Sequence, residues 1–109
     1  EGHHRRGLPL PMIADLLAGA VARRFRLPGK GAIQPGFDAD LAFVGLDDEW
    51  QLTTADLLDR HQLSPYAGRR FRGRVVRTLL RGEPIFQQGE ATTTPRGRLI
   101  RPEFTTYKV

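Results

Sequence analysis

The chain has 109 residues, so it can hold one small domain, and a complete α/β barrel enzyme of about 250 residues is excluded. Hydrophobic residues make up 39% and charged residues 27%, which is typical of folded globular proteins and excludes a disordered tail. The absence of cysteine excludes disulfides, thiolate metal sites and a cysteine nucleophile. The longest apolar run is far shorter than the roughly 20 residues of a membrane span. We therefore expect a soluble, cytoplasmic protein with no membrane partner.

Basic residues outnumber acidic ones, and nearly all of them are arginine. The formal net charge is +5, from 17 basic and 12 acidic residues, and the only lysines are Lys30 and Lys108. Six arginines follow one another without an intervening acid: Arg69, Arg70, Arg72, Arg74, Arg77 and Arg81. Such a run can bind nucleic-acid phosphates, so a small basic nucleic-acid-binding module is one hypothesis. A solvated strand face, or an interface with acidic neighbours, is the simpler interpretation and the one we favour.

The first strong pattern predicts a helix over residues 10–25. Its apolar residues recur at intervals of three and four: Ile13, Leu16, Leu17, Ala20, Val21 and Phe25. Pro11 suits the first turn, where a missing amide hydrogen costs little, and the pair Pro28-Gly29 ends the helix. Gly19 and the alanines around it would let a neighbouring segment approach closely.

Residues 31–46 predict a tight turn followed by a buried strand. The pair Pro35-Gly36 favours a turn in which the glycine takes a positive φ angle. This turn would allow Ile33 to pair with a strand over residues 41–46. That strand is apolar on both faces, which predicts cover on both sides, and the acidic residues 47–49 mark its end.

The second half of the chain predicts a short helix, a loop and a hairpin. A threonine at position 53 or 54 can cap a helix, and a proline and a glycine break the loop 61–69. Apolar residues predict a strand over 73–80, which the sequence Arg-Gly-Glu turns back into residues 84–87. From residue 89 onward the sequence is mostly irregular, and residues 104–109 carry no assignment.

These elements are too few to close a sheet or to bury both sides of the helix. An apolar strand without cover implies that its partners lie outside the chain. The pattern alone therefore indicates a part of a larger fold.

Residues that could bind a metal are scarce. A hydrolytic metal site needs several His, Asp or Glu side chains that converge on the ion and leave one position for water. His3 and His4 are adjacent, so their side chains diverge, and His61 stands alone in its loop. We therefore predict that none of the three histidines is a metal ligand.

Residues that could perform acid–base or nucleophilic chemistry are equally few. Asp38 and Asp40 could act as a general acid and base, but bonding to turn amides is the better explanation of two carboxylates at this spacing. Ser64 is the single serine, precedes a proline, and lacks a G-x-S-x-G elbow. The prediction is therefore that the chain contains no catalytic, substrate-binding or metal-ligating residue.

One feature of the sequence resembles a known superfamily, and the segment before it departs from that superfamily's pattern. Residues 31–41 read G-A-I-Q-P-G-F-D-A-D-L, which resembles the signature G-x-I-x-x-G-x-D-A-D-L that follows the barrel in the amidohydrolase superfamily. Residues 20–27 read A-V-A-R-R-F-R-L and depart from the superfamily's pattern N-P-A-R-x-F-G-L, in which Asn, Pro and Gly stand where this chain has other residues.

Further blocks resemble the allantoinase branch of the cyclic amidohydrolases. They are residues 6–12, residues 60–69 with the sequence R-H-Q-L-S-P-Y-A-G-R, and residues 78–82. The block H-x-x-S-P-Y-x-G-R is the discriminating one, because hydantoinases and dihydropyrimidinases tend to carry a different block here. The similarity runs from about residue 1 to residue 102.

The resemblance implies a fold. The parent would be an α/β enzyme with a TIM barrel, in which residues 1–28 form the terminal helical segment of the barrel. Residues 29–109 would form the C-terminal portion of a β-sandwich built from both ends of the chain. The N-terminal remainder of the same protein would then supply the missing partners, and the intact enzyme would be a homo-oligomer, namely a homotetramer.

The resemblance also implies a reaction. The intact enzyme would open the hydantoin ring of allantoin to give allantoate, a step of purine catabolism, with a binuclear zinc centre whose bound hydroxide attacks the ring carbonyl. The superfamily's ligands are an H-x-H pair, a carboxylated lysine, two further histidines and an aspartate, and all of them precede this region. A hydantoinase or dihydropyrimidinase is the alternative within the superfamily.

Overall fold

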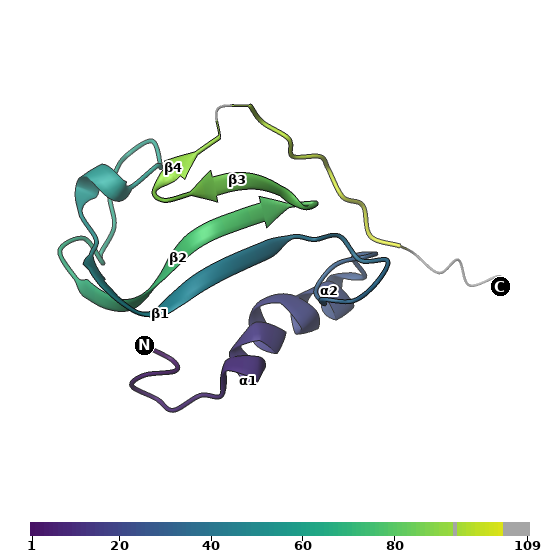
Figure 1. Cartoon of the computed structure of the whole chain (residues 1–109), viewed down its shortest axis with the longest axis horizontal. Helices are drawn as coiled ribbons and strands as arrows, with labels where there is room; N and C mark the ends of the chain where they lie inside the picture. Colours follow the sequence, from purple (N-terminus) through teal and green to yellow (C-terminus); the bar gives the residue numbers. More distant parts are fainter. Residues whose placement is uncertain (93, 104–109) are drawn as a thin grey trace.

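A computed structural model describes residues 1–92 and 94–103 of the chain. A helical segment is followed by a four-stranded antiparallel sheet (Figure 1). The helical elements are α1 (Leu10–Ala14), the π-helix η1 (Asp15–Gly19), α2 (Ala20–Phe25) and the 3₁₀ turn η2 (Thr54–Asp56). The strands are β1 (Leu41–Gln51), β2 (Arg70–Leu80), β3 (Glu83–Gln87) and β4 (Glu90–Ala91).

The helix predicted over residues 10–25 is confirmed, with a change of winding in its middle. Residues 15–19 form a π-helical turn, a widening that a three-and-four spacing of apolar residues does not reveal. The helix ends in a Schellman motif, in which the Leu27 amide donates to the Ala22 carbonyl and the Arg26 amide to that of Arg23. Arg26 itself takes the left-handed conformation, with φ 52° and ψ 48°.

The sheet is a meander in the order β1-β2-β3-β4. The predicted hairpin between β2 and β3 is confirmed, with Leu80 opposite Glu83. The prediction that acidic residues 47–49 end the first strand is wrong. The chain bulges between Gly45 and Glu49, and pairing then resumes with Glu49 opposite Arg72. The bulge lets the strand continue to Gln51 past its acidic residues.

Two further predictions need correction. The turn at Pro35-Gly36 forms, with the Phe37 amide bonded to the Gln34 carbonyl, but Ile33 is 88% exposed and belongs to no strand. The loop instead folds back on the helix end, where the Asp38 amide donates to the Gly29 carbonyl. The helix expected after Thr53 is a single 3₁₀ turn closed by a capping box between Thr53 and Asp56.

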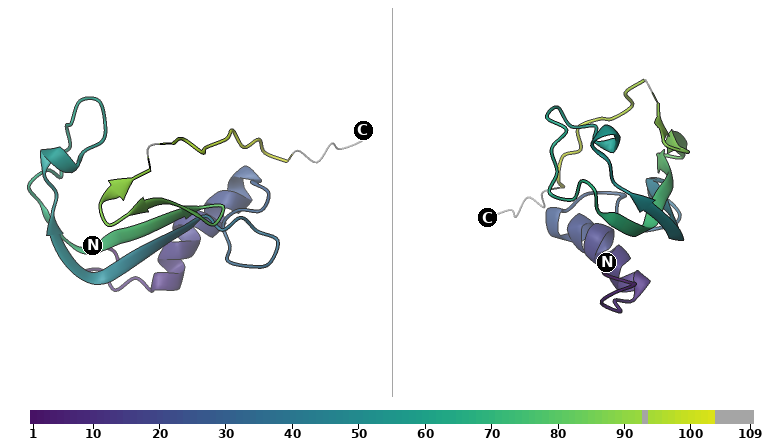
Figure 2. Two further views of the ribbon diagram at one scale, coloured as in Figure 1. Left: turned by 45° about the horizontal axis from the view of Figure 1, so that its top comes forward. Right: turned by 90° about the vertical axis from the view of Figure 1, so that its left-hand side faces the viewer.

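Helix and sheet are joined through loops. Among the described residues, no Cα of the helical segment 10–25 lies within 8 Å of a Cα in a strand. Figure 2 shows the helical segment on one side of the curved sheet and the loop 52–69 rising on the other. Residues 94–103, here called the strap, run from β4 back to the helix end, where the Glu103 amide donates to the Arg26 carbonyl (Figure 1).

Very little of this fold is buried. In the described ranges, Ala22 is the single buried apolar side chain, and it packs with Gly19 against Gly31. The accessible surface of 9340 Å² exceeds the roughly 6,000 Å² expected of a folded monomer of this mass. The radius of gyration of 16.7 Å likewise exceeds the expected value of about 13 Å. Residues 1–92 and 94–103 therefore lack the closed core of an independent domain.

Substitution of Gly31 tests the close contact between the helix and residues 31–40, the loop that carries the signature and is here called the signature loop. A Cβ at Gly31 would lie 2.6 Å from the Ala22 Cβ and 2.9 Å from the Ala18 carbonyl oxygen. Gly36 has the same φ angle of 85° but open space around it. We expect G36A to cost about 1 kcal/mol from backbone strain alone, and G31A about 2–3 kcal/mol. Urea unfolding followed by circular dichroism measures both, and equal losses would show that the helix contact contributes nothing.

Substitution of Arg26 tests the helix cap. A non-glycine residue in the left-handed conformation is strained, and glycine relieves the strain. We expect R26G to raise the free energy of unfolding by about 0.5–1 kcal/mol, with R24G, inside the helix, lowering it by a similar amount. The same unfolding measurement applies, and destabilisation by R26G would contradict the strain at this cap.

Candidate functional site

Two of the three histidines bond to backbone carbonyls. A ring nitrogen of His3 lies 2.9 Å from the Leu8 oxygen, and one of His4 lies 2.7 Å from the Leu46 oxygen. His61 is exposed in its loop. Within residues 1–92 and 94–103, no three His, Cys, Asp or Glu side chains are grouped so that they could hold a metal ion.

Ser64 has a local structural role. Its hydroxyl accepts a hydrogen bond from the Tyr66 amide at 3.2 Å, a turn contact typical of serine. The loop that carries it is closed at its base, where Leu52 exchanges backbone hydrogen bonds with Gly68 and Arg69.

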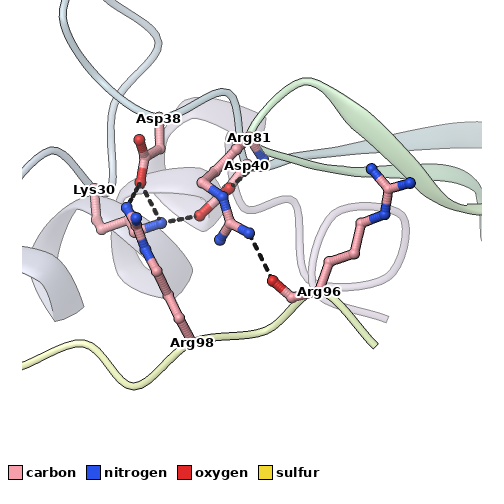
Figure 3. Close-up of polar contacts among 6 residues, drawn as sticks. All are labelled: Lys30, Asp38, Asp40, Arg81, Arg96 and Arg98. Carbon is pink, nitrogen blue, oxygen red and sulfur yellow. Dashed lines mark hydrogen bonds and ion pairs between the residues drawn. The ribbon is translucent and has the colours of Figure 1, made fainter. Parts of the chain in front are cut away.

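Asp38 and Asp40 converge on one ammonium group. Lys30 Nζ lies 2.7 Å from Asp38 Oδ2 and also bonds Asp40 Oδ2 (Figure 3). The Lys30 side chain is only 16% exposed. We call Lys30, Asp38 and Asp40 the polar joint, because they lie where the helix, the signature loop and the sheet meet.

The polar joint reaches the sheet through backbone groups. The Arg81 amide, at the turn between β2 and β3, donates to Asp40 Oδ1 at 2.8 Å. Beside it, the Gly82 amide donates to the Ala39 carbonyl at 3.0 Å. The carboxylates thus have the structural role that their spacing predicts, although one of their partners is remote in sequence.

The polar joint also contacts the strap. Arg98 Nη2 lies 3.9 Å from Asp38 Oδ2, and the Arg81 guanidinium donates to the Arg96 carbonyl at 2.6 Å (Figure 3). Arg96 in turn lies 3.7 Å from a carboxylate oxygen of Glu83. Three segments distant in sequence therefore meet at one group of charges.

The charges of the joint stabilise one another. Partial burial alone would raise the pKa of Asp40, but the hydrogen bonds from Lys30 and from the Arg81 amide outweigh it and lower this pKa. Hydrogen bonds to Asp38 and Asp40 raise the pKa of Lys30. Asp40 therefore stays ionised at neutral pH and is engaged by two donors, an arrangement suited to holding the chain and unsuited to donating a proton.

Sequence reasoning missed Lys30, although a signal for it was present. Lys30 is the one lysine among the described residues of a chain that otherwise uses arginine. A compact ammonium can sit between two carboxylates, whereas a planar guanidinium requires a wider and flatter arrangement. The use of lysine at position 30, in a chain that otherwise uses arginine, therefore indicated the residue at the centre of the joint.

The run of arginines lies along β2 and at its ends, and all of its members except Arg70 have a partner for the side chain among the described residues. Arg72 pairs with Asp47 at 2.5 Å and Arg69 with Glu1 at 2.9 Å. Arg74 lies over the Trp50 ring, and Arg77 over that of Phe43. These contacts agree with the interpretation of a strand face and disfavour a free phosphate-binding surface.

Large apolar side chains are exposed on both the helix and the sheet. On the helix they are Leu10, Met12, Leu16, Leu17, Val21 and Phe25, with Leu17 76% and Phe25 61% exposed. On the sheet they are Phe43, Val44, Leu46, Val75 and Val76. The cover that the sequence predicts for the strand is absent among the described residues, as expected if the partners lie elsewhere. Separately, no described helix has both the length and the apolar character needed to cross a membrane.

The dependence of the free energy of unfolding on pH, in acid and in base, tests the polar joint. Because the pKa of Asp40 is lowered on folding, its contribution is present above the unfolded value of about 3.9 and is lost as pH falls through the folded value. The contribution of Lys30 is present below about 10.4 and is lost as pH rises through its raised folded value. We expect D40N to cost about 1 kcal/mol at pH 7, and this cost to shrink only as pH falls from about 3.9 through the lowered folded pKa of Asp40.

Urea unfolding followed by the fluorescence of Trp50, the single tryptophan, measures this difference at each pH. D47N, which removes an exposed ion pair on β1, serves as the control and should change stability little at any pH. A D40N deficit that stayed constant down to strong acid would rule out the assigned charge state.

The chain is similar to two curated allantoinases over nearly its whole length. It is 53% identical over 103 residues to that of Rubrobacter xylanophilus, covering 94% of this chain and 23% of the relative. It is 54% identical over 102 residues to that of Deinococcus radiodurans, covering 94% and 22%. The chain thus spans less than a quarter of the length of these relatives. No family model matches the chain.

Solved structures of related enzymes contain the same fold. The L-hydantoinase of Arthrobacter aurescens superposes with a TM-score of 0.74 at 30% identity, over 79% of this chain and 19% of that one. The dihydropyrimidinase of Brevibacillus agri superposes with a TM-score of 0.72 over 83% and 20%, and at 23% identity it supports the fold alone. The resemblance read from the signature and the H-x-x-S-P-Y-x-G-R block is thereby confirmed: the chain is similar in sequence to one segment of the allantoinases and in fold to one segment of an L-hydantoinase.

Proposed function

We propose that this chain is the C-terminal segment of an allantoinase-like enzyme that opens the hydantoin ring of allantoin to give allantoate. The observation that carries the proposal is the identity of 53–54% with two allantoinases over 94% of the chain. A cyclic amidohydrolase of the hydantoinase or dihydropyrimidinase type is the second candidate, supported by the 30% identity to an L-hydantoinase. The much higher identity to allantoinases favours the first.

The segment would contribute structure to the intact enzyme. Residues 1–28 would be the terminal helical segment of the barrel, and residues 29–109 the C-terminal portion of a β-sandwich. The N-terminal remainder of the protein would cover the apolar side chains of the helix and of the sheet. Exposed side chains such as Leu17 and Val44, at 76% and 49%, support this assignment, because a contiguous apolar surface is typical of an interface.

The chemistry would be performed elsewhere in the protein. A binuclear zinc centre, when bound in the intact enzyme, would supply an activated hydroxide. The described residues do not fit such a centre, because they offer no group of three suitable side chains. We therefore assign no step of the reaction to this segment. A homo-oligomer in the cytoplasm, acting in purine catabolism, completes the proposal.

A chimeric enzyme tests the proposal. The matching segment of the Deinococcus radiodurans allantoinase is replaced by this chain, and hydrolysis of allantoin is compared with that of hydantoin and dihydrouracil. We expect the chimera to retain allantoin hydrolysis within about tenfold of the parent, because the exchanged segment supplies packing and no reacting group.

The control is the same relative with the segment deleted, which should be insoluble or inactive. The 109-residue chain alone, supplied with zinc, should hydrolyse none of the three substrates. Activity of the isolated chain, or a chimera that folds yet hydrolyses no allantoin, would refute the assignment.

A further inference from the structure

The described residues connect the helix to the sheet through loops and polar groups, and not through close packing of their backbones. The helical segment and the strands have no Cα atoms within 8 Å of each other, and the one buried apolar side chain, Ala22, packs within the helix and signature loop. What connects the two parts is polar: the joint on one side and the turn that carries His4 on the other.

The strap adds a second polar connection across the joint. It meets Asp38 through Arg98, Glu83 through Arg96, and the helix end through the bond from the Glu103 amide to the Arg26 carbonyl. Leu99, an apolar residue of the strap, is 81% exposed. The next residue, Ile100, is half-buried, and every other described residue of the strap is exposed. Charges and hydrogen bonds therefore hold most of the strap, with partial burial of one apolar side chain.

Asp38 connects these two sets of contacts. Its Oδ2 atom faces both the Lys30 ammonium at 2.7 Å and the Arg98 guanidinium at 3.9 Å, whereas Asp40 faces Lys30 and the Arg81 amide (Figure 3). Loss of Asp38 would remove the ion pair between the polar joint and Arg98 and so loosen the strap, while Asp40 still bonds Lys30 and the sheet. Loss of Lys30 would leave two carboxylates close together without their shared cation and would open the whole joint.

We propose that the polar joint, formed by Lys30, Asp38 and Asp40, acts as a hinge that sets the angle between helix and sheet. The strap, residues 94–103, acts as a latch that restrains this hinge. The helix and the sheet would then be rigid parts with an adjustable connection. The latch would be sensitive to salt, because Arg98 is largely exposed, whereas the less exposed Lys30 pairs would resist screening. This inference is independent of which ring the intact enzyme opens.

The absence of cysteine makes the angle directly measurable in the full 109-residue chain. Spin labels on R24C of α2 and Q87C of β3 report the distance between helix and sheet by pulsed electron resonance. We expect one narrow distance peak in the otherwise unchanged chain, loss of that peak in K30M, and its partial recovery in K30R. Labels on R70C and Q87C, both within the sheet, are the control and should keep their distance in every variant.

The latch is measured separately by trypsin cleavage after Arg98. We expect D38N to accelerate this cut roughly two- to fivefold, the range that one partly exposed ion pair supports, and D47N to leave it unchanged. High salt should accelerate the cut more in the unsubstituted chain than in D38N, because D38N lacks the Arg98 pair but keeps the exposed pair of Arg96 with Glu83. The hinge is overturned if the distance distribution between helix and sheet is broad in the unsubstituted chain, or if it stays narrow in K30M. The latch is overturned if D38N leaves the rate of cleavage after Arg98 unchanged.

Discussion

The Lys30 ammonium group holds two carboxylates that belong to the same short loop, and the path of the chain from helix to sheet depends on it. Asp38 and Asp40 are two residues apart, yet both reach Lys30, because the loop folds back on the helix end through the bond from the Asp38 amide to Gly29. Asp40 then fixes the turn between β2 and β3 through the Arg81 amide. The spacing Asp-Ala-Asp in the signature thus has a structural cause: one acid faces the strap and the other faces the sheet. The glycine at position 31 completes the arrangement, because no side chain fits between the loop and Ala22.

A polar connection of this kind suits a segment whose apolar surfaces face outward. A domain with its own core fixes its elements by burial, which contributes far more than exposed ion pairs do. Here the large side chains of the helix and of the sheet are left for other partners, so their burial would contribute when the remainder of the protein docks. Until then, the charges of the joint are what keep the parts near their final positions. Their modest strength is consistent with a connection that adjusts during assembly.

The sequence predicted the regular parts well because local rules decide them. The helix over 10–25, the turn at Pro35-Gly36 and the β2–β3 hairpin each follow from spacing or from turn residues. Predictions failed where a distant partner decides the outcome. The strand β1 passes its acidic residues because β2 offers a partner beyond the bulge, and Ile33 leaves the sheet because its loop is drawn to the helix end. The candidate site was likewise predicted only in part. The sequence indicated a structural role for the carboxylates, but it did not reveal their shared partner Lys30 or the strap, which depend on contacts between remote residues.

The departures from the superfamily's helix pattern acquire a physical meaning in this fold. The pattern has a glycine where this chain has Arg26, and Arg26 takes the left-handed conformation that glycine adopts without cost. The cap is nevertheless complete, since both hydrogen bonds of the Schellman motif are present and the Arg26 carbonyl also accepts a bond from the strap. The pattern's proline is replaced by Val21, which keeps its amide hydrogen, so the π-helical turn at residues 15–19 does not arise from a proline. These replacements therefore alter the stability of one helix and its cap, while the joint that positions the sheet retains every charge it requires.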